Sequence, residues 1–156
     1  MDNDLKWNGN RIISYSFINE RILVLRLKVK RGNMTVIATY ATEDGRKEKL
    51  EAFYDTLQKE VDKYIKSDFL IIVGDMNARI GQQPIPKIIG SFGEPHLNSN
   101  GMELREFVTF NELKVTNIFF RKKDIHKYTW SARGQRSLLD YLIVSKKLRY
   151  QSLQRV

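Results

Sequence analysis

The sequence predicts one α/β (α+β) domain that spans residues 1–156. Residues 21–29 and 34–40 alternate apolar and polar side chains, as half-buried strands do. Residues 46–66 carry apolar side chains every three or four positions, which is the spacing of an amphipathic helix. Residues 69–73 form a short apolar run rich in Ile, typical of a buried strand. A hydrophobic content of 42% over 156 residues suffices for a real core.

The first half of the chain should form a hairpin followed by a helical crossover. A first strand is expected over 11–17. The turn at 31–33 contains a Gly and an Asn, which tolerate positive φ, so the two alternating strands around it should pair antiparallel. The helix over 46–66 then crosses the sheet and leads to the apolar strand at 69–73. We expect helices or another layer to cover both faces of that last strand.

The second half should contain a long loop, a helix and short strands. Residues 81–95 hold three Pro and three Gly and predict a surface loop beside the end of the apolar strand. A second helix is expected over 101–113, with Asn98, Ser99 or Asn100 as its cap. Further strands are predicted at 115–120, 128–131 and 138–144.

Composition narrows the class of protein. No cysteine is present, which excludes a disulfide framework and a thiolate site, and no leader or membrane-length apolar run is visible, so we expect an intracellular protein, nuclear or cytoplasmic. The net charge is +9, and residues 121–156 carry ten Lys and Arg against two Asp. Four aromatic residues, Trp130 among them, interleave with those charges. This stretch predicts either a polyanion-binding surface or a solvated face.

Polar residues at the end of the apolar strand predict a candidate site. Asp75 and Asn77 follow the run 69–74 directly, where ligands usually bind in layered α/β proteins. A carboxylate can accept a proton from an attacking water while an amide orients it or contacts a phosphate, which suits phosphoester hydrolysis. The alternative is that Asp75 and Asn77 only form a local turn.

A second acidic residue interrupts an apolar strand. Asp140 lies within 138–144, and a buried carboxylate there would need a partner, such as an imidazole or a metal site. The alternative is an acid that faces solvent or caps a turn. His96 and His126 each lie in polar surroundings and are interpreted as surface histidines rather than catalytic ones.

Four ordered motifs resemble the endonuclease/exonuclease/phosphatase superfamily. The resemblance is greatest to the endonuclease domains of non-LTR retrotransposons and to the craniofacial development protein 2 group, and it runs over about 21–147. The motifs are VIATYA at 36–41, IIVGDMNAR at 71–79, YTWS at 128–131 and SLLDYLI at 137–143, with supporting similarity from 100 to 120.

The resemblance implies a four-layer α/β sandwich of two sheets with outer helices, a Mg²⁺ cofactor and cleavage of phosphodiester bonds, most often in DNA. It implies that Asp75 activates the water, Asn77 holds the scissile phosphate, Tyr40 stabilises its charge and Asp140 orients a histidine. It places Arg46, Thr129, Trp130 and Ser137 on the substrate side, with Ser137 as a phosphate contact. No residue is assigned as a metal ligand.

The chain also departs from the family pattern. Thr42 stands where the family has Pro, which leaves the assignment of Arg46 to phosphate binding open. The amino-terminal Asn and metal-binding Glu motifs and the closing Ser-Asp-His motif find no match, so we expect an incomplete domain that is weakly active or inactive alone.

A second hypothesis is a non-catalytic basic nucleic-acid-binding or chromatin-associated protein. A nucleotide-binding α/β domain is disfavoured because no Gly-rich phosphate loop follows a strand. Uncovered sheet edges predict self-association.

Overall fold

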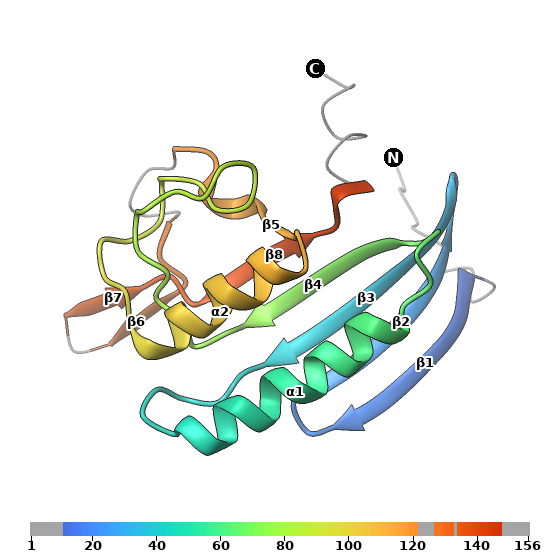
Figure 1. The fold of residues 1–156 in the computed structure, drawn as a ribbon, viewed down its shortest axis with the longest axis horizontal. Helices are drawn as coiled ribbons and strands as arrows, with labels where there is room; N and C mark the ends of the chain where they lie inside the picture. Colours follow the sequence, from blue (N-terminus) through green and yellow to red (C-terminus); the bar gives the residue numbers. More distant parts are fainter. Residues whose placement is uncertain (1–10, 122–126, 133, 148–156) are drawn as a thin grey trace, which may run out of the picture.

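A computed structural model describes residues 11–121, 127–132 and 134–147. The structure is a mixed α/β fold with a six-stranded sheet in the order β1-β2-β3-β4-β8-β5 and a separate two-stranded sheet, β6-β7 (Figure 1). The elements are β1 Ile12–Asn19, β2 Ile22–Val29, β3 Gly32–Tyr40, α1 Lys47–Lys63, β4 Phe69–Asp75, α2 Ser99–Phe110, β5 Lys114–Val115, the 3₁₀ helix η2 Thr116–Ile118, β6 Trp130–Ala132, β7 Gln135–Ser137 and β8 Asp140–Val144.

The predicted hairpin and crossover are confirmed. β2 and β3 pair antiparallel from Ile22 opposite Thr39 to Val29 opposite Gly32, and β1 joins β2 antiparallel. α1 then returns the chain so that β4 runs parallel to β3. The helix ends at Lys63, three residues before the expected end, because Tyr64 adopts extended backbone angles.

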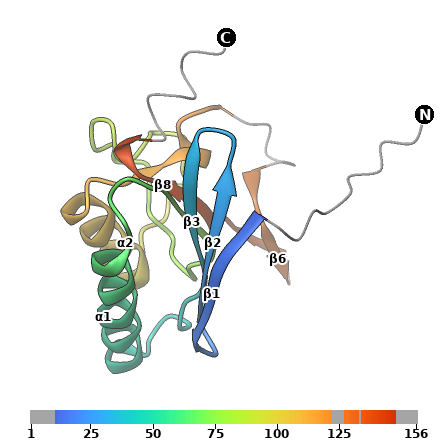
Figure 2. The ribbon, with the colours of Figure 1, turned by 90° about the vertical axis from the view of Figure 1, so that its right-hand side faces the viewer.

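Both helices cover the same face of the six-stranded sheet (Figures 1 and 2). Alternate strand residues such as Ile37, Leu70 and Ile72 are fully buried beneath Leu57 of α1 and Leu104 of α2. Packing of these apolar side chains is the main source of stability for the sheet. As expected, Asn98 caps α2, since its side-chain oxygen accepts a hydrogen bond from the Gly101 amide at 2.8 Å.

The opposite face of the sheet differs from the expectation for β4. Val73 is 38% exposed and its neighbour Leu142 on β8 is 40% exposed, whereas Phe69 on the same face of β4 is buried, so within the described residues this face is open towards the carboxyl end of β4. The run is apolar throughout, and such a run does not reveal whether one face or two are packed. The described residues therefore form the six-stranded sheet, its helix layer and the small β6-β7 sheet, which agrees with an incomplete form of the expected sandwich.

Two strand expectations are corrected and one strand was missed. The strand expected over 115–120 is limited to β5, because residues 116–118 form the 3₁₀ helix η2. Asp140 starts β8 and is exposed, so it does not interrupt a buried strand. The short β7 pairs with β6 around a turn at Gly134 and carries too few apolar residues to be recognised by periodicity.

The two edges of the sheet are unlike each other. Val115 of β5 is bridged by Ile89 from the long loop, whereas β1 lies outermost, pairs only with β2 among the described strands and is exposed over most of its length. Self-association through this edge stays a prediction. No described helix combines the length and apolar character needed to span a membrane.

Candidate functional site

Three candidate side chains from separate motifs lie side by side at one end of the sheet. Tyr40, the last residue of β3, is paired with Asp75, the last residue of β4. Asp75 is in turn paired with Asp140, the first residue of β8. Residues paired across neighbouring strands project from the same face of a sheet, with adjacent strands about 4.8 Å apart. The register therefore brings together three residues that are separated by 35 and 65 positions in the sequence.

Glycine is required immediately before Asp75. Gly74 has a φ of +145°, and a Cβ atom there would lie 1.9 Å from the Thr39 carbonyl oxygen. Only a residue without a side chain permits β3 and β4 to approach so closely at this point. The Gly-Asp sequence thus sets the position of the Asp75 carboxylate beside Tyr40.

Asp75 and Asn77 form a local turn as well as part of the cluster. The Asn77 amide donates to Asp75 Oδ1 at 2.8 Å, and Asn77 has a φ of +46°. Its side-chain nitrogen donates to the Ala41 carbonyl at 2.9 Å. Burial raises the pKa of Asp75 above its ordinary value, the Asn77 amide opposes this shift, and the charge of Asp140 adds to it. Asp75 and Asn77 can therefore form a local turn and still belong to the candidate site.

Arg21 extends the cluster by one strand, and sequence reasoning missed it. The Arg21 carbonyl accepts a hydrogen bond from the Tyr40 amide at 2.9 Å, which continues the β2-β3 ladder. Its Nη1 donates to the carbonyl oxygens of Tyr40 and Ala41 at 3.2 and 3.3 Å, and its guanidinium carbon lies 5.5 Å from the centre of the Tyr40 ring. A single arginine beside the hairpin gives no periodic signal, so only the strand register reveals it.

Asp140 is held in place through its backbone. The Thr129 hydroxyl oxygen accepts from the amides of Leu139 and Asp140 at 3.1 and 3.2 Å. The Asn117 side chain donates to the Asp140 carbonyl at 3.0 Å. Thr129 therefore lies at the site, but its oxygen is engaged by the protein itself. The exposed Asp140 carboxylate is free to face Asp75 and solvent.

The remaining substrate-side candidates divide between exposed and buried positions. Trp130 is 44% exposed and pairs with Ser137 across the β6-β7 hairpin. Ser137 is only 6% exposed, which leaves little of its hydroxyl for a ligand to contact. Arg46 is exposed directly before α1. His96 is exposed, and His126 lies outside the described residues.

A buried ion pair supports the chain that leads into Asp140. Glu94, from the long loop, accepts from Arg79 at 3.0 Å and from the Leu138 amide at 3.3 Å. The Tyr141 hydroxyl donates to the carbonyls of Ala78 and Leu138 at 2.7 and 2.9 Å. These bonds fix the segment before β8 against the segment after β4, so they set the distance between the two aspartates.

The acidic pair matches part of a metal site. Carboxylate oxygens suit Mg²⁺, which proteins often hold with one or two carboxylates and substrate phosphates. Within residues 11–121, 127–132 and 134–147, however, no group of three or more His, Asp or Glu side chains could hold a metal ion. Asp75 and Asp140 alone do not make a complete metal site.

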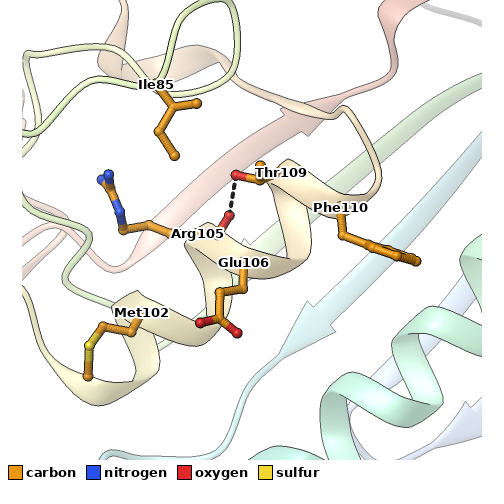
Figure 3. Close-up of a pocket in the computed structure, with 6 residues that line it drawn as sticks. All are labelled: Ile85, Met102, Arg105, Glu106, Thr109 and Phe110. Atoms are coloured by element: carbon orange, nitrogen blue, oxygen red, sulfur yellow. Dashed lines mark hydrogen bonds between the residues drawn. The ribbon is translucent and has the colours of Figure 1, made fainter.

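A separate open pocket lies on the outer surface of α2 (Figure 3). Arg105 projects into it from the helix and donates to the carbonyls of Ile80 and Gln83 at 3.0 and 2.9 Å. None of the sequence-predicted site residues lines this pocket, which is formed by Ile85, Met102, Arg105, Glu106, Thr109 and Phe110. The pocket is therefore distinct from the cluster at the sheet end.

Comparisons with known proteins agree with this architecture. No protein-family profile matches the chain. Craniofacial development protein 2 of Bos taurus is 36% identical over 143 residues, and that of Tragulus javanicus is 35% identical over the same length, each alignment covering 90% of this chain. The chain spans about a quarter of the length of these relatives, 24% and 25% respectively.

Two solved structures share the fold at low sequence identity. The endonuclease domain of TRAS1, a telomere-specific non-LTR retrotransposon, superposes with a TM-score of 0.60 at 16% identity and covers 83% of this chain and 50% of its own. An endonuclease/exonuclease/phosphatase family protein from Leptotrichia buccalis C-1013-b superposes with a TM-score of 0.51 at 15% identity, over 80% of this chain and 42% of its own.

Proposed function

Because the chain is a homologue of craniofacial development protein 2 and has a fold of the endonuclease/exonuclease/phosphatase type, we propose that it is a phosphodiester-cleaving domain that acts on nucleic acid. The observation that carries the proposal is the register that aligns Tyr40, Asp75 and Asp140 on three adjacent strands. This cluster contains an acid, a second acid and a phenol at one exposed end of the sheet. We propose DNA as the substrate, because the TRAS1 structure that shares this fold is the endonuclease domain of a telomere-specific retrotransposon.

Asp75 is the residue suited to accept a proton from water. Its pKa is raised by burial, so its carboxylate is a stronger base than an exposed aspartate. The water oxygen would form a bond to phosphorus while its proton passes to the Asp75 carboxylate. The bond between phosphorus and the leaving oxygen would break, and that oxygen would take a proton from solvent. Tyr40, which is 49% exposed, can donate its hydroxyl to a phosphate oxygen, and the second amide hydrogen of Asn77 can do the same.

The 156-residue chain should cleave only slowly by itself. Asp75 and Asp140 face each other, and no ion pair joins a cationic side chain to either of them in the described structure. A phosphate that approached this pair would be repelled unless a cation intervened. We propose that Mg²⁺ supplies this charge and that activity depends on it, with oxygen ligands beyond those described.

Nicking of supercoiled plasmid by the purified chain tests the proposal. The assay compares Mg²⁺ with EDTA, and the wild type with Asp75→Ala and with Glu51→Ala, an exposed acid on α1 that serves as the matched control. We expect slow nicking that requires Mg²⁺, is lost in Asp75→Ala and is retained in Glu51→Ala. Nicking that persists in Asp75→Ala would show that the cluster is not the active site.

Binding without cleavage is the second candidate function, favoured by one observation. Trp130 and Arg136 are both exposed on the β6-β7 hairpin, on its two opposite faces. An exposed indole can stack on a base, and an exposed cation can contact a phosphate elsewhere on the same strand. If plasmid is bound in a salt-dependent manner but never nicked, this non-catalytic function replaces the first proposal.

A further inference from the structure

We propose that Arg21 binds a second phosphate of the nucleic-acid strand, next to the one presented to Asp75. This inference rests on the proposed function and deepens it, because it makes the site selective for a chain of phosphodiesters over a single phosphate group. It assigns Arg21 as a substrate-binding residue at the outer end of the cluster.

The position of Arg21 follows from the order of the strands. Arg21 precedes β2, Tyr40 ends β3, Asp75 ends β4 and Asp140 starts β8, and these strands are consecutive in the sheet. With strands about 4.8 Å apart, the Arg21 backbone lies two strand spacings, about 10 Å, from that of Asp75. The long arginine side chain can cover much of this distance to a phosphate that neighbours the reacting one.

Arg21 is one of several described arginines that no carboxylate pairs with, and it is the one beside Tyr40. Arg26 and Arg79 are each paired with a buried carboxylate, Asp68 at 2.6 Å and Glu94 at 3.0 Å. Arg21 instead donates from Nη1 to two backbone carbonyls, and within the described residues no carboxylate pairs with it and no acceptor is bonded to Nε or Nη2. A guanidinium that keeps donors in reserve suits bidentate contact with a phosphate.

The side chain is already held in the orientation that the contact requires. The Ala41 carbonyl accepts from both Arg21 Nη1 and Asn77 Nδ2, at 3.3 and 2.9 Å. The Tyr40 ring supports the guanidinium through a cation-π contact. Arg21 is thus connected to Asn77 through the Ala41 carbonyl and to Tyr40 directly, and little conformational entropy is lost when a phosphate binds.

A purely structural role for Arg21 makes a different prediction from a phosphate contact. A residue that only caps the carbonyls at the end of β3 would change affinity without changing its dependence on salt. A residue that binds phosphate releases counterions, so its loss lowers the slope of log K against log salt by about 0.7 for a single strand. The salt slope therefore separates the two roles.

The test measures binding of a fluorescein-labelled oligothymidylate of twelve nucleotides by anisotropy, at a fixed concentration of Mg²⁺, between about 50 and 200 mM salt. We expect Arg21→Gln to weaken binding about 3–10-fold at the lowest salt and to reduce the slope by about 0.7, with Arg21→Lys retaining the wild-type slope. Arg31→Gln is the matched control, an exposed arginine in the β2-β3 turn at the far end of the sheet, and should leave both quantities unchanged.

Three results would overturn the assignment: an unchanged slope in Arg21→Gln, equal effects of Arg21→Gln and Arg31→Gln, or no binding by the wild type. Far-UV circular dichroism checks that each variant is folded. Because the assay needs no cleavage, a chain that binds through Arg21 but never nicks plasmid would refute the proposed nuclease function and leave the Arg21 contact intact.

Discussion

The two ends of β4 carry aspartates in opposite environments. Asp68, directly before the strand, is 1% exposed and accepts from Arg26 Nε and Nη2 at 2.6 and 3.0 Å and from Thr35 at 3.0 Å. The hydrogen bonds with Arg26 hold its pKa below the ordinary value. Asp75, at the other end, has a raised pKa and faces a second acid.

The difference shows which carboxylate serves the fold and which is available to a ligand. At the amino end every strong acceptor is satisfied by the protein, so nothing external is needed. At the carboxyl end the protein brings two negative charges together and leaves the arginine beside them with unused donors. Such an arrangement is stabilised by binding something from outside, which is typical of a functional site.

The largest effect should come from a substitution at Gly74. In Gly74→Ala the added Cβ would overlap the Thr39 carbonyl, in addition to the strain of a positive φ. We expect a loss of about 3–5 kcal/mol in the free energy of unfolding. Urea denaturation measures it. Gly32→Ala is the control, since Gly32 has a φ of +125° but no atom within 4 Å of the added Cβ, and it should cost about 1–2 kcal/mol. Equal losses would show that the close approach of β3 and β4 is unimportant.

Removal of the amino-end carboxylate should rank second. Asp68→Ala leaves Arg26 and Thr35 without their shared acceptor, and we expect it to destabilise the protein by about 2–3 kcal/mol. Glu51→Ala, which removes an exposed i,i+4 partner of Lys47, should change stability by less than about 0.5 kcal/mol. The same denaturation experiment compares them. If the two variants unfold at the same denaturant concentration, the contrast between the ends of β4 is wrong.

Neutralising the carboxyl-end carboxylate should have a small effect of the opposite sign. Asp75→Asn keeps an oxygen that can accept from the Asn77 amide while it removes the repulsion from Asp140. We expect a gain of less than about 1 kcal/mol at neutral pH, because solvent screens a half-exposed pair. Thermal unfolding followed by circular dichroism detects it, and a clear loss of stability would contradict this view of the pair.

The smallest expected effect is a difference between Asp75 and Asp68 in how each contributes to stability as pH changes. The raised pKa of Asp75 means that its stabilising contribution is complete when it is protonated and is lost as pH rises through the folded pKa. The advantage of Asp75→Asn should therefore grow from about pH 4 towards pH 7. The lowered pKa of Asp68 means the reverse, so the deficit of Asp68→Asn should shrink below about pH 4. Denaturation midpoints of both variants and the wild type, measured across this pH range, test both expectations. If the two variants differ from the wild type in the same direction as pH rises, the comparison of the two aspartates is wrong.

The sequence predicted the elements whose periodicity is strong. The β2-β3 hairpin, α1 and the apolar β4 were found because alternation and three-to-four spacing persist over many residues. The short β7 and the 3₁₀ helix η2 were missed, since a few residues carry no period. The expectation that both faces of β4 would be covered was wrong at its carboxyl end, where Val73 is exposed. An apolar run in the sequence does not reveal what covers each face of a strand.

The sequence was sufficient to select the residues of the candidate site but not to show how they are arranged in space. Motif resemblance selected Tyr40, Asp75 and Asp140, and the strand register then showed that they are neighbours. Their catalytic roles stay predictions. Arg21 could not be found from local sequence, because its significance depends on the Ala41 carbonyl and the Tyr40 ring, which are close to it only after β2 and β3 pair.

The shared bonds of Glu94 have a consequence for local opening of the protein. Since one carboxylate binds both Arg79 and the Leu138 amide, the long loop cannot detach without exposing that amide to solvent. Amide hydrogen exchange at Leu138 should therefore follow that at Ile89, whose amide donates to the Ile85 carbonyl within the same loop. The loop and the start of β8 would then open as one cooperative unit, and Asp140 would be displaced from Asp75 whenever they did.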